Sequence, residues 1–416
     1  MYFIYRLLLL LYTKTVYLVA LLGNNKAKLF IKGRHKIFEK LAHQLQKRPP
    51  NTPTIWFHAA SLGEFEQARP VIELCKTHFP THWIVVSFFS PSGYEIRKDY
   101  ANAHTITYLP FDSPQNARKF IQLINPQLIL FAKYDFWYHY FREAHWQKIP
   151  LIVFSAVFRP KDWFFSPLNA WFLAVLRKVH HFFVQNESSA QCLQHQNISQ
   201  YTIAGDTRFD YVAELRQNPK TFPLIETFCQ KQPLWVIGSC WGGDWNILYP
   251  FINSNTLPLK IIVAPHEIHR PTIEKWQKQL QKNSLLYSQA NAQNITEVDV
   301  LFLDNVGMLA SIYQYAQYSY VGGGFGEGLH NILEPAVFGN AIIWGKDYKK
   351  FEEAYAIIDR EGGFSVKNTE ELQKVFELIY QNDALLTKIK QQNQSFILEN
   401  TGSKWLILEK MKQAIE

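Results

Sequence analysis

A run of glycines at positions 322, 323, 324, 326 and 328 opens the segment VGGGFGEGLHNILEPAVFG, which spans 321–339. Glycine lets a backbone approach a ligand closely, and N–H groups ahead of a helix attract anions. Glu334 falls in the first turn of the expected helix, where a carboxylate can accept hydrogen bonds from a ribose diol. The segment predicts a nucleotide site in which the glycine run holds the phosphate and Glu334 binds the sugar; a tight turn without a ligand is the alternative. Its spacing matches neither a P-loop nor the G-x-G-x-x-G pattern, so nothing indicates NAD.

Three other apolar runs of the second half also end in polar residues. LWVIG leads to Ser239, KIIVA leads to PHEIHR (265–270), and VLFL leads to DNVG (304–307). Histidine and arginine side chains there would add donors for a phosphate or carboxylate. An ordinary polar loop is the alternative for PHEIHR, and its histidines do not indicate a metal. These loops all follow expected strands, where open α/β sheets bind ligands.

The first half places candidate residues after strands as well. Glu64 ends HAASLGE, Asp135 lies in AKYDFWY, and Arg208 lies in AGDTRFD. The spacing of Glu64 suits a general base and equally a capping box, in which Ser61 caps a helix and Glu64 reaches back. Asp135 could be a helix cap, and Arg208 could belong to a surface ion pair.

Short apolar runs alternate with amphipathic helical patterns along most of the chain, which predicts βαβ units and parallel sheets. A polar segment with three prolines, 216–233, interrupts the alternation and is typical of a linker. The expected fold is α/β, with two Rossmann-like doubly wound domains facing each other across a cleft. The expected divisions are an N-terminal helix (1–22), a first domain (23–215), the linker (216–233), a second domain (234–395) and a C-terminal helix (396–416).

The first 23 residues, MYFIYRLLLLLYTKTVYLVALLG, are apolar enough and long enough for a membrane helix. Lys14 lies near the middle, where a charge costs roughly 2.5 to 3.5 kcal/mol on insertion scales. Lys26, Lys28 and Lys32 follow, and basic residues after an apolar helix favour the cytoplasmic leaflet. The segment predicts a membrane anchor that either spans the bilayer or lies in it; a buried helix of the first domain is the alternative.

The composition narrows the classes of partner. A net charge of +8 favours acidic partners, but no zinc-finger or RNA-binding signature is present, so nucleic acid is not expected. Four scattered cysteines without metal-ligand spacing indicate a reducing compartment. No metal and no cofactor is expected.

Taken together, the segments resemble the 3-deoxy-D-manno-octulosonic acid (Kdo) transferases of lipopolysaccharide synthesis over nearly the whole chain. The motifs that carry the resemblance are the apolar N-terminus, HAASLGE, SPSGYE, YLPFD, GDTRFD, GSCW, PHEIHR, DNVGML and GGGFGEGLHNILEP. The resemblance implies a GT-B fold and metal-independent, inverting transfer of Kdo from CMP-Kdo to the lipid A precursor (lipid IVA). It also implies that the first domain binds the acceptor and the second binds the donor, at the cytoplasmic face of an anionic inner membrane.

The resemblance implies that Glu64 is the catalytic base and that Asp135 and Arg208 stabilise the transition state. The implied CMP contacts are Ser239, Pro265, His266, Arg270, Val306, Gly307, Met308, Gly323, Gly324, Asn331, Ile332, Leu333 and Glu334. The chain departs from the family in places: Asp135-Phe136-Trp137-Tyr138 replaces a frequent Glu-x-Trp-Pro, Lys133 replaces a second acid, and Arg208 and Gly324 replace a common lysine and serine. Arginine keeps the charge of lysine but changes its geometry.

Two further hypotheses remain open from the sequence. One is another GT-B enzyme, such as a UDP-sugar 2-epimerase or transferase. The other is a membrane-attached protein of the same fold that binds a nucleotide or lipid without catalysis.

Overall fold

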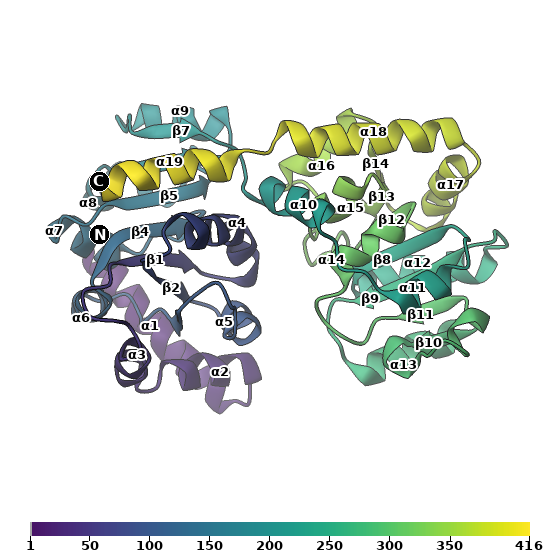
Figure 1. The fold of residues 1–416 in the computed structure, drawn as a ribbon, viewed down its shortest axis with the longest axis horizontal. Coiled ribbons are helices and arrows are strands. Elements are labelled where there is room, and N and C mark those ends of the chain that lie inside the picture. Colours follow the sequence, from purple (N-terminus) through teal and green to yellow (C-terminus); the bar gives the residue numbers. More distant parts are fainter. Residues whose placement is uncertain (1) are drawn as a thin grey trace. The chain divides into compact units, whose positions relative to one another are not determined.

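The structure is a computed structural model that describes residues 2–416, and the chain divides into two compact units. Unit 1 comprises the chain up to Tyr211 together with Asn400–Glu416, and unit 2 comprises Val212–Glu399. The chain therefore returns to its first unit at the C-terminus, where α19 (Ser403–Ile415) contacts α4 and β4 (Figure 1).

Unit 1 is built on a parallel sheet of seven strands in the order β3-β2-β1-β4-β5-β6-β7. Its strands are β1 (Thr54–Ala59), β2 (Trp83–Phe88), β3 (Thr105–Tyr108), β4 (Pro126–Ala132), β5 (Leu151–Ala156), β6 (His181–Val184) and β7 (Tyr201–Ile203). Its other helices are α1 (Tyr2–Leu21), α2 (Asn25–Arg34), α3 (Ile37–Leu45), α4 (Leu62–His78), α5 (Pro91–Arg97), α6 (Pro114–Ile124), α7 (Tyr138–Trp146), α8 (Ala170–Leu176) and α9 (Glu187–His195).

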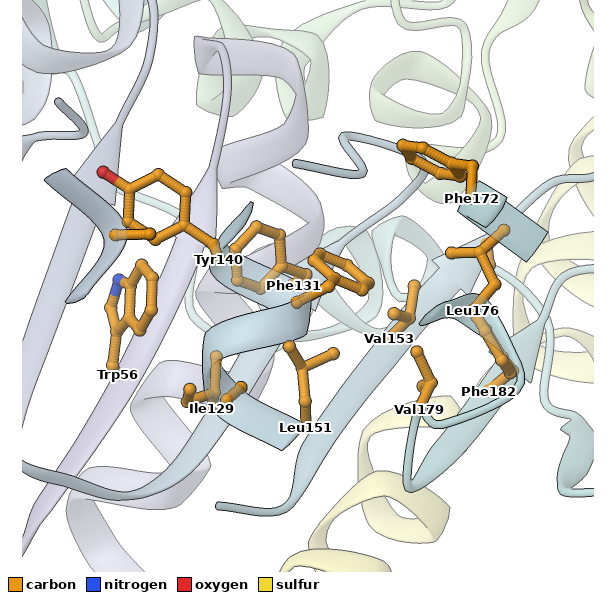
Figure 2. Close-up of a cluster of buried hydrophobic side chains, with 14 of the residues drawn as sticks. Trp56, Ile129, Phe131, Tyr140, Leu151, Val153, Phe172, Leu176, Val179 and Phe182 are labelled. Carbon is orange, nitrogen blue, oxygen red and sulfur yellow. The ribbon is translucent and has the colours of Figure 1, made fainter. Parts of the chain in front are cut away.

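The sheet of unit 1 buries apolar side chains on both faces, as parallel sheets do. Alternate strand residues such as Trp56, Phe131 and Val153 form one cluster with side chains of α7 and α8 (Figure 2). The residues between them, such as Phe57 and Leu130, form the opposite cluster with α4 and α19. This two-sided burial explains why the strands read as continuous apolar runs in the sequence.

Unit 2 repeats the architecture with a second seven-stranded parallel sheet, in the order β10-β11-β9-β8-β12-β13-β14. Its strands are β8 (Leu234–Cys240), β9 (Lys260–Pro265), β10 (Ser284–Leu286), β11 (Val300–Phe302), β12 (Tyr318–Val321), β13 (Ala341–Gly345) and β14 (Gly363–Val366). Its helices are α11 (Pro223–Cys229), α12 (Gly242–Ser254), α13 (Arg270–Gln279), α14 (Leu309–Ile312), α15 (Leu333–Phe338), α16 (Glu352–Asp359), α17 (Thr369–Tyr380) and α18 (Asp383–Glu399); α10 (Arg208–Gln217) begins in unit 1 and continues into unit 2. The α/β class and the two doubly wound sheets predicted from the sequence are confirmed.

The segment predicted as a linker, 216–233, contains the helix α11. Ile225 and Phe228 of that helix are fully buried and pack under the sheet of unit 2. The compact units divide at Tyr211, a few residues before this segment. The prolines and polar residues of 216–233 therefore mark the ends of a short helix within unit 2.

In each sheet the strand order reverses near the middle. In unit 1 the reversal lies between β1 and β4, and in unit 2 it lies between β8 and β12. Loops leave the carboxyl ends of such neighbouring strands in opposite directions, so a crevice opens there and ligands bind in it. The loops after β1, β4, β8 and β12 are therefore where this fold positions a site.

The N-terminal helix α1 is apolar and lies along unit 1. Among the described residues it is the helix long and apolar enough to cross a membrane. Tyr2 lies 3.1 Å from the His139 ring, Tyr5 donates to Asp112 Oδ2 at 2.6 Å, and Ala20 is buried. Both ends of α1 are thus held against the protein, while most of its large apolar side chains are exposed.

Candidate functional site

Glu64 lies in the first turn of α4, directly after β1. Ser61 caps this helix by accepting from the Glu64 N–H at 3.4 Å, and Glu64 Oε2 accepts from the Ala60 N–H at 2.6 Å. The capping arrangement expected from the spacing is therefore present, with Glu64 reaching one residue further back than Ser61. Burial and then the charge of Asp135 raise the pKa of Glu64 to about 8, although Lys133 acts in the opposite direction. A cap alone does not need such a pKa, whereas a carboxylate with a raised pKa is a stronger base.

Asp135 lies in the loop after β4, on the other side of the same switch point. Its Oδ2 atom accepts from His58 Nε2 at 2.9 Å and from Trp137 Nε1 at 2.6 Å, and the side chain is 23% exposed. Trp137 occupies the N-cap of α7 without a side-chain capping bond. Asp135 is thus held by two side chains and not by the backbone of a helix, which does not fit the capping alternative.

His58 holds Asp135 from within β1, and its role is not evident from sequence alone. The His58 side chain is fully buried, with Nδ1 at 2.8 Å from Ser87 Oγ, and Trp56 Nε1 donates to the same oxygen at 2.7 Å. If the Ser87 hydroxyl donates to Nδ1, a neutral His58 carries its proton on Nε2 and donates it to Asp135. The one available signal was a histidine within an otherwise apolar strand.

Arg208 lies at the start of α10 and pairs with the buried Asp206. Its Nε and Nη2 atoms each lie 2.8 Å from Asp206 Oδ2. Gln67 of α4 donates to both oxygens of Asp206 at 3.1 Å, and Gln185 donates to Oδ2. The predicted site residues of unit 1 therefore lie at one edge of the sheet. Helix α4 carries Glu64 itself, and its Gln67 holds Asp206, the partner of Arg208.

In unit 2, the glycine run packs tightly against neighbouring strand ends. A Cβ at Gly322 would lie 2.2 Å from Ser239 O, and one at Gly324 would lie 2.6 Å from Gly345 Cα. The N–H groups of Gly322 and Gly328 donate to carbonyls within the unit. Gly322 and Gly324 are thus required by backbone packing, whether or not the loop also binds an anion.

Asp244 organises this loop, although no sequence pattern singles it out. Its Oδ2 accepts from the N–H groups of Gly323 at 2.9 Å and Trp241 at 3.0 Å, and its Oδ1 accepts from the Tyr320 hydroxyl at 2.9 Å. The side chain is fully buried, and burial raises its pKa. Asp244 therefore fastens the glycine loop to α12 and β12.

Three aromatic rings gather at the switch point of unit 2. Trp241 Nε1 donates to His330 Nε2 at 2.9 Å, and the rings are nearly parallel. The His266 ring stacks on Trp241 at 4.2 Å and on His330 at 4.4 Å between centroids. Burial and then the charge of His266 lower the pKa of His330 to about 4, so His330 is neutral at pH 7 with its proton on Nδ1. Stacked rings of this kind offer a flat face that suits a planar ligand.

The other predicted contact residues of unit 2 lie on the same sheet edge but differ in exposure and in their hydrogen-bond partners. Two of these residues are joined directly, because the Asn331 amide donates to Glu334 Oε1 at 3.2 Å. Arg270 is exposed and pairs with Glu274 at 3.1 Å. Ser239 has a positive φ at the end of β8, Pro265 ends β9, and Val306, Gly307 and Met308 follow β11, with Val306 82% exposed. Ile332 and Leu333 are fully buried.

Comparison with known proteins gives consistent matches. The family model of 3-deoxy-D-manno-octulosonic-acid transferase (kdotransferase) matches residues 35–211. The 3-deoxy-D-manno-octulosonic acid transferase of Rickettsia bellii is 26% identical over 404 residues, which cover 94% of this chain and 93% of the relative. That of Rickettsia felis is 26% identical over 357 residues, covering 83% and 76%.

Among solved structures, UDP-GlcNAc 2-epimerase from Neisseria meningitidis superposes with a TM-score of 0.62 and 15% identity, covering 86% of this chain and 100% of that chain. A likeness at this identity shows the shared GT-B-like fold alone. The matches that span both units carry the same family name, in agreement with the motifs at the two switch points. Along most of its length the chain is thus similar to the 3-deoxy-D-manno-octulosonic acid transferases, a family of glycosyltransferases.

Proposed function

We propose that the protein is an inverting glycosyltransferase that moves Kdo from CMP-Kdo to the lipid A precursor, lipid IVA. The observation that carries the proposal is a carboxylate of raised pKa at the switch point of unit 1. The acceptor hydroxyl is a poor nucleophile until a base takes its proton, and Glu64 has the place and the basicity for that step. Inversion requires attack from the face opposite the departing CMP.

In this proposal Asp135 and Arg208 stabilise the transition state, in which positive charge develops on the Kdo ring and negative charge on the leaving phosphate. Both side chains are held in place before a substrate binds, by His58 and Trp137 in one case and by Asp206 in the other. Preorganised charges of this kind act without reorganising during the reaction. Arg208 and Arg270 supply positive charge, so we propose that no metal is needed; EDTA should then leave the transfer rate unchanged.

Unit 2 is proposed to bind the CMP part of the donor. The ring platform of Trp241, His266 and His330 supports this, because a nucleobase offers a flat face. Arg270 would contact an anionic group, and Glu334 would accept hydrogen bonds from the ribose diol. The contacts of Ser239, Pro265, Val306–Met308, Gly323, Gly324 and Asn331–Leu333 implied by the family resemblance belong to the same proposal.

We also propose that α1 holds the protein in the cytoplasmic face of the inner membrane. Because Tyr2, Tyr5 and Ala20 all contact unit 1, the helix fits a position in the plane of the bilayer better than one across it. Its exposed leucines would enter the acyl region. The lysines of α2 would meet anionic headgroups.

The test is a transfer assay with radiolabelled CMP-Kdo and lipid IVA in detergent micelles. The proposal predicts labelled lipid whose formation depends on both substrates. Tight CMP-Kdo binding without any labelled product would favour a non-catalytic binding protein, and conversion of a UDP-sugar to its 2-epimer would favour an epimerase.

A further inference from the structure

A pocket of about 380 Å³ opens where α1 and α2 meet the segment that follows β2. Val16 and Val19 of α1, Ala27 and Phe30 of α2, and Phe89 contribute to its lining, which is mostly apolar. The volume lies within the range of about 300 to 1,000 Å³ that is usual for small-molecule sites.

A buried arginine, Arg34, holds two aromatic residues of the pocket lining in place. The Arg34 guanidinium lies 3.7 Å from the centre of the Phe30 ring and donates to Phe89 O at 2.6 Å. Phe30 and Phe89 pack edge to face with centroids 5.2 Å apart. The aromatic wall is therefore held in place and does not depend on a ligand to form it.

The pocket adjoins the candidate site of unit 1 by two routes. The Phe89 ring lies 4.5 Å from the ring of Trp137, which donates to Asp135. The N–H of Ser90, another lining residue, donates to Ala60 O at 2.7 Å, and the Ala60 N–H in turn binds Glu64. A ligand in the pocket would thus end next to the loops that carry both carboxylates.

The pocket also adjoins the apolar exposed face of α1. Tyr12 lines the pocket and is 43% exposed, while Leu8, Leu11 and Leu18 of the same helix are at least half exposed. Lys26 lies at the pocket and is exposed. Apolar walls beside a cation suit an amphiphile that has an acyl chain and an anionic group.

We propose that this pocket binds one fatty-acyl chain of the lipid acceptor and so places the acceptor sugar at Glu64. The inference rests on the proposed function, since it assumes a lipid acceptor at that site. The chain would enter from the bilayer along α1, and Lys26 would meet a phosphate of the same molecule.

Filling the pocket tests the inference. Ala27→Trp and Val16→Trp insert an indole from opposite walls, and Leu29→Trp on α2 is the matched control because Leu29 is not part of this lining. The readout is the ratio of kcat/KM for lipid IVA to kcat/KM for its deacylated form. Losing the burial of a few methylene groups should lower this ratio by roughly tenfold in both pocket variants. The control should keep the parental ratio, and parental ratios in both pocket variants would overturn the inference.

A crosslinking experiment separates this inference from the proposed function, because it needs no turnover. The probe is lipid IVA with a diazirine at the end of one acyl chain, irradiated with the full-length protein in phosphatidylglycerol vesicles. Crosslinks should concentrate on peptides that contain Val16, Ala27 or Phe89, and excess unlabelled lipid IVA should remove them. Crosslinks spread along exposed α1 and unaffected by lipid IVA would show ordinary bilayer contact and overturn the inference. A protein that crosslinks as expected but transfers no Kdo would contradict the proposed function instead.

Discussion

At the scale of single residues, the site depends on two carboxylates whose surroundings differ. Asp135 accepts from the side chains of His58 and Trp137, whereas Glu64 accepts from backbone N–H groups. Such environments push neighbouring acids towards different roles, one remaining ionised and one exchanging a proton. The sequence placed Glu64 and Asp135 each after a strand, but the pairing of those strands and the effect of one carboxylate on the other depend on packing that no spacing reveals.

The pH dependence of transfer should report the raised pKa of Glu64. A base acts in its deprotonated form, so kcat/KM should rise with pH, reach half its maximum at the pKa of about 8 and level off above it. Asp135→Asn removes a charge that raises this pKa. In that variant the rise of kcat/KM should therefore occur at lower pH, although the maximum rate falls. Initial rates across the pH range with CMP-Kdo and lipid IVA measure this. If kcat/KM of the parent enzyme rises at the pKa of an ordinary glutamate, Glu64 does not act as proposed.

His58 should act through Asp135. His58→Leu removes the Nε2 donor, and we expect kcat to fall by roughly tenfold or more because a charge-assisted hydrogen bond is worth about 1.5 to 3 kcal/mol. The donor KM should not change, and His58→Gln, which offers an N–H at a similar position, should restore part of the rate. In a double-mutant cycle, His58→Leu should add little to Asp135→Asn. Additive losses would mean that His58 only supports the fold.

At the scale of elements, the same device appears in both units: a loop at the strand-order reversal is fastened by a buried side chain. His58 fastens the loop after β4, and Asp244 fastens the glycine loop after β12. The glycines themselves were visible in the sequence, but their close packing against neighbouring strand ends was not. Their N–H groups are largely bound within the protein, because the loop packs closely on the ends of β8 and β13.

Asp244→Asn should loosen the glycine loop. Asparagine keeps the shape but presents an amide N–H₂ where N–H and hydroxyl donors converge, which should cost about 1 to 3 kcal/mol of unfolding free energy. Urea denaturation measures the cost, and the KM for CMP-Kdo should rise as well. Asp347→Asn is the control, since Asp347 is exposed. Unchanged stability together with an unchanged donor KM would show that the loop does not depend on Asp244.

The exposed face of α1 should mediate membrane binding. Changing both Leu8 and Leu18 to lysine leaves the contacts of Tyr2, Tyr5 and Ala20 intact but places charges in the acyl region, at roughly 2.5 to 3.5 kcal/mol each near the bilayer centre. The variant should move from sedimenting vesicles to the supernatant. Leu378→Lys and Leu398→Lys, at exposed positions on α17 and α18, should leave sedimentation unchanged. If the variant with both changes in α1 still sediments with vesicles, another part of the protein makes the membrane contact.

At the scale of the whole molecule, the two doubly wound sheets could be predicted because parallel strands buried on both faces read as apolar runs. The strands β7, β10 and β14 have only three or four residues, so each offers little apolar pattern to read. The return of α19 to unit 1 was not foreseen, because it depends on long-range packing of Ile407 and Met411. The candidate site residues were predicted from loops at strand ends, while the hydrogen bonds by which His58 and Asp244 hold those loops needed the structure.

The central claim is that Glu64 is the base for Kdo transfer, and Glu64→Gln tests it most directly. Glutamine can still accept from the Ala60 N–H, so the cap is kept, but it cannot take a proton. The folded-state pKa of Glu64 is raised, so the stability of the fold declines as pH rises through about 8, and the neutral variant should melt no lower than the parent there. With saturating CMP-Kdo and lipid IVA, kcat should fall by roughly 10²- to 10⁴-fold while CMP-Kdo still binds with parental affinity. A kcat within a few-fold of the parent would contradict the account and leave Glu64 as a helix cap.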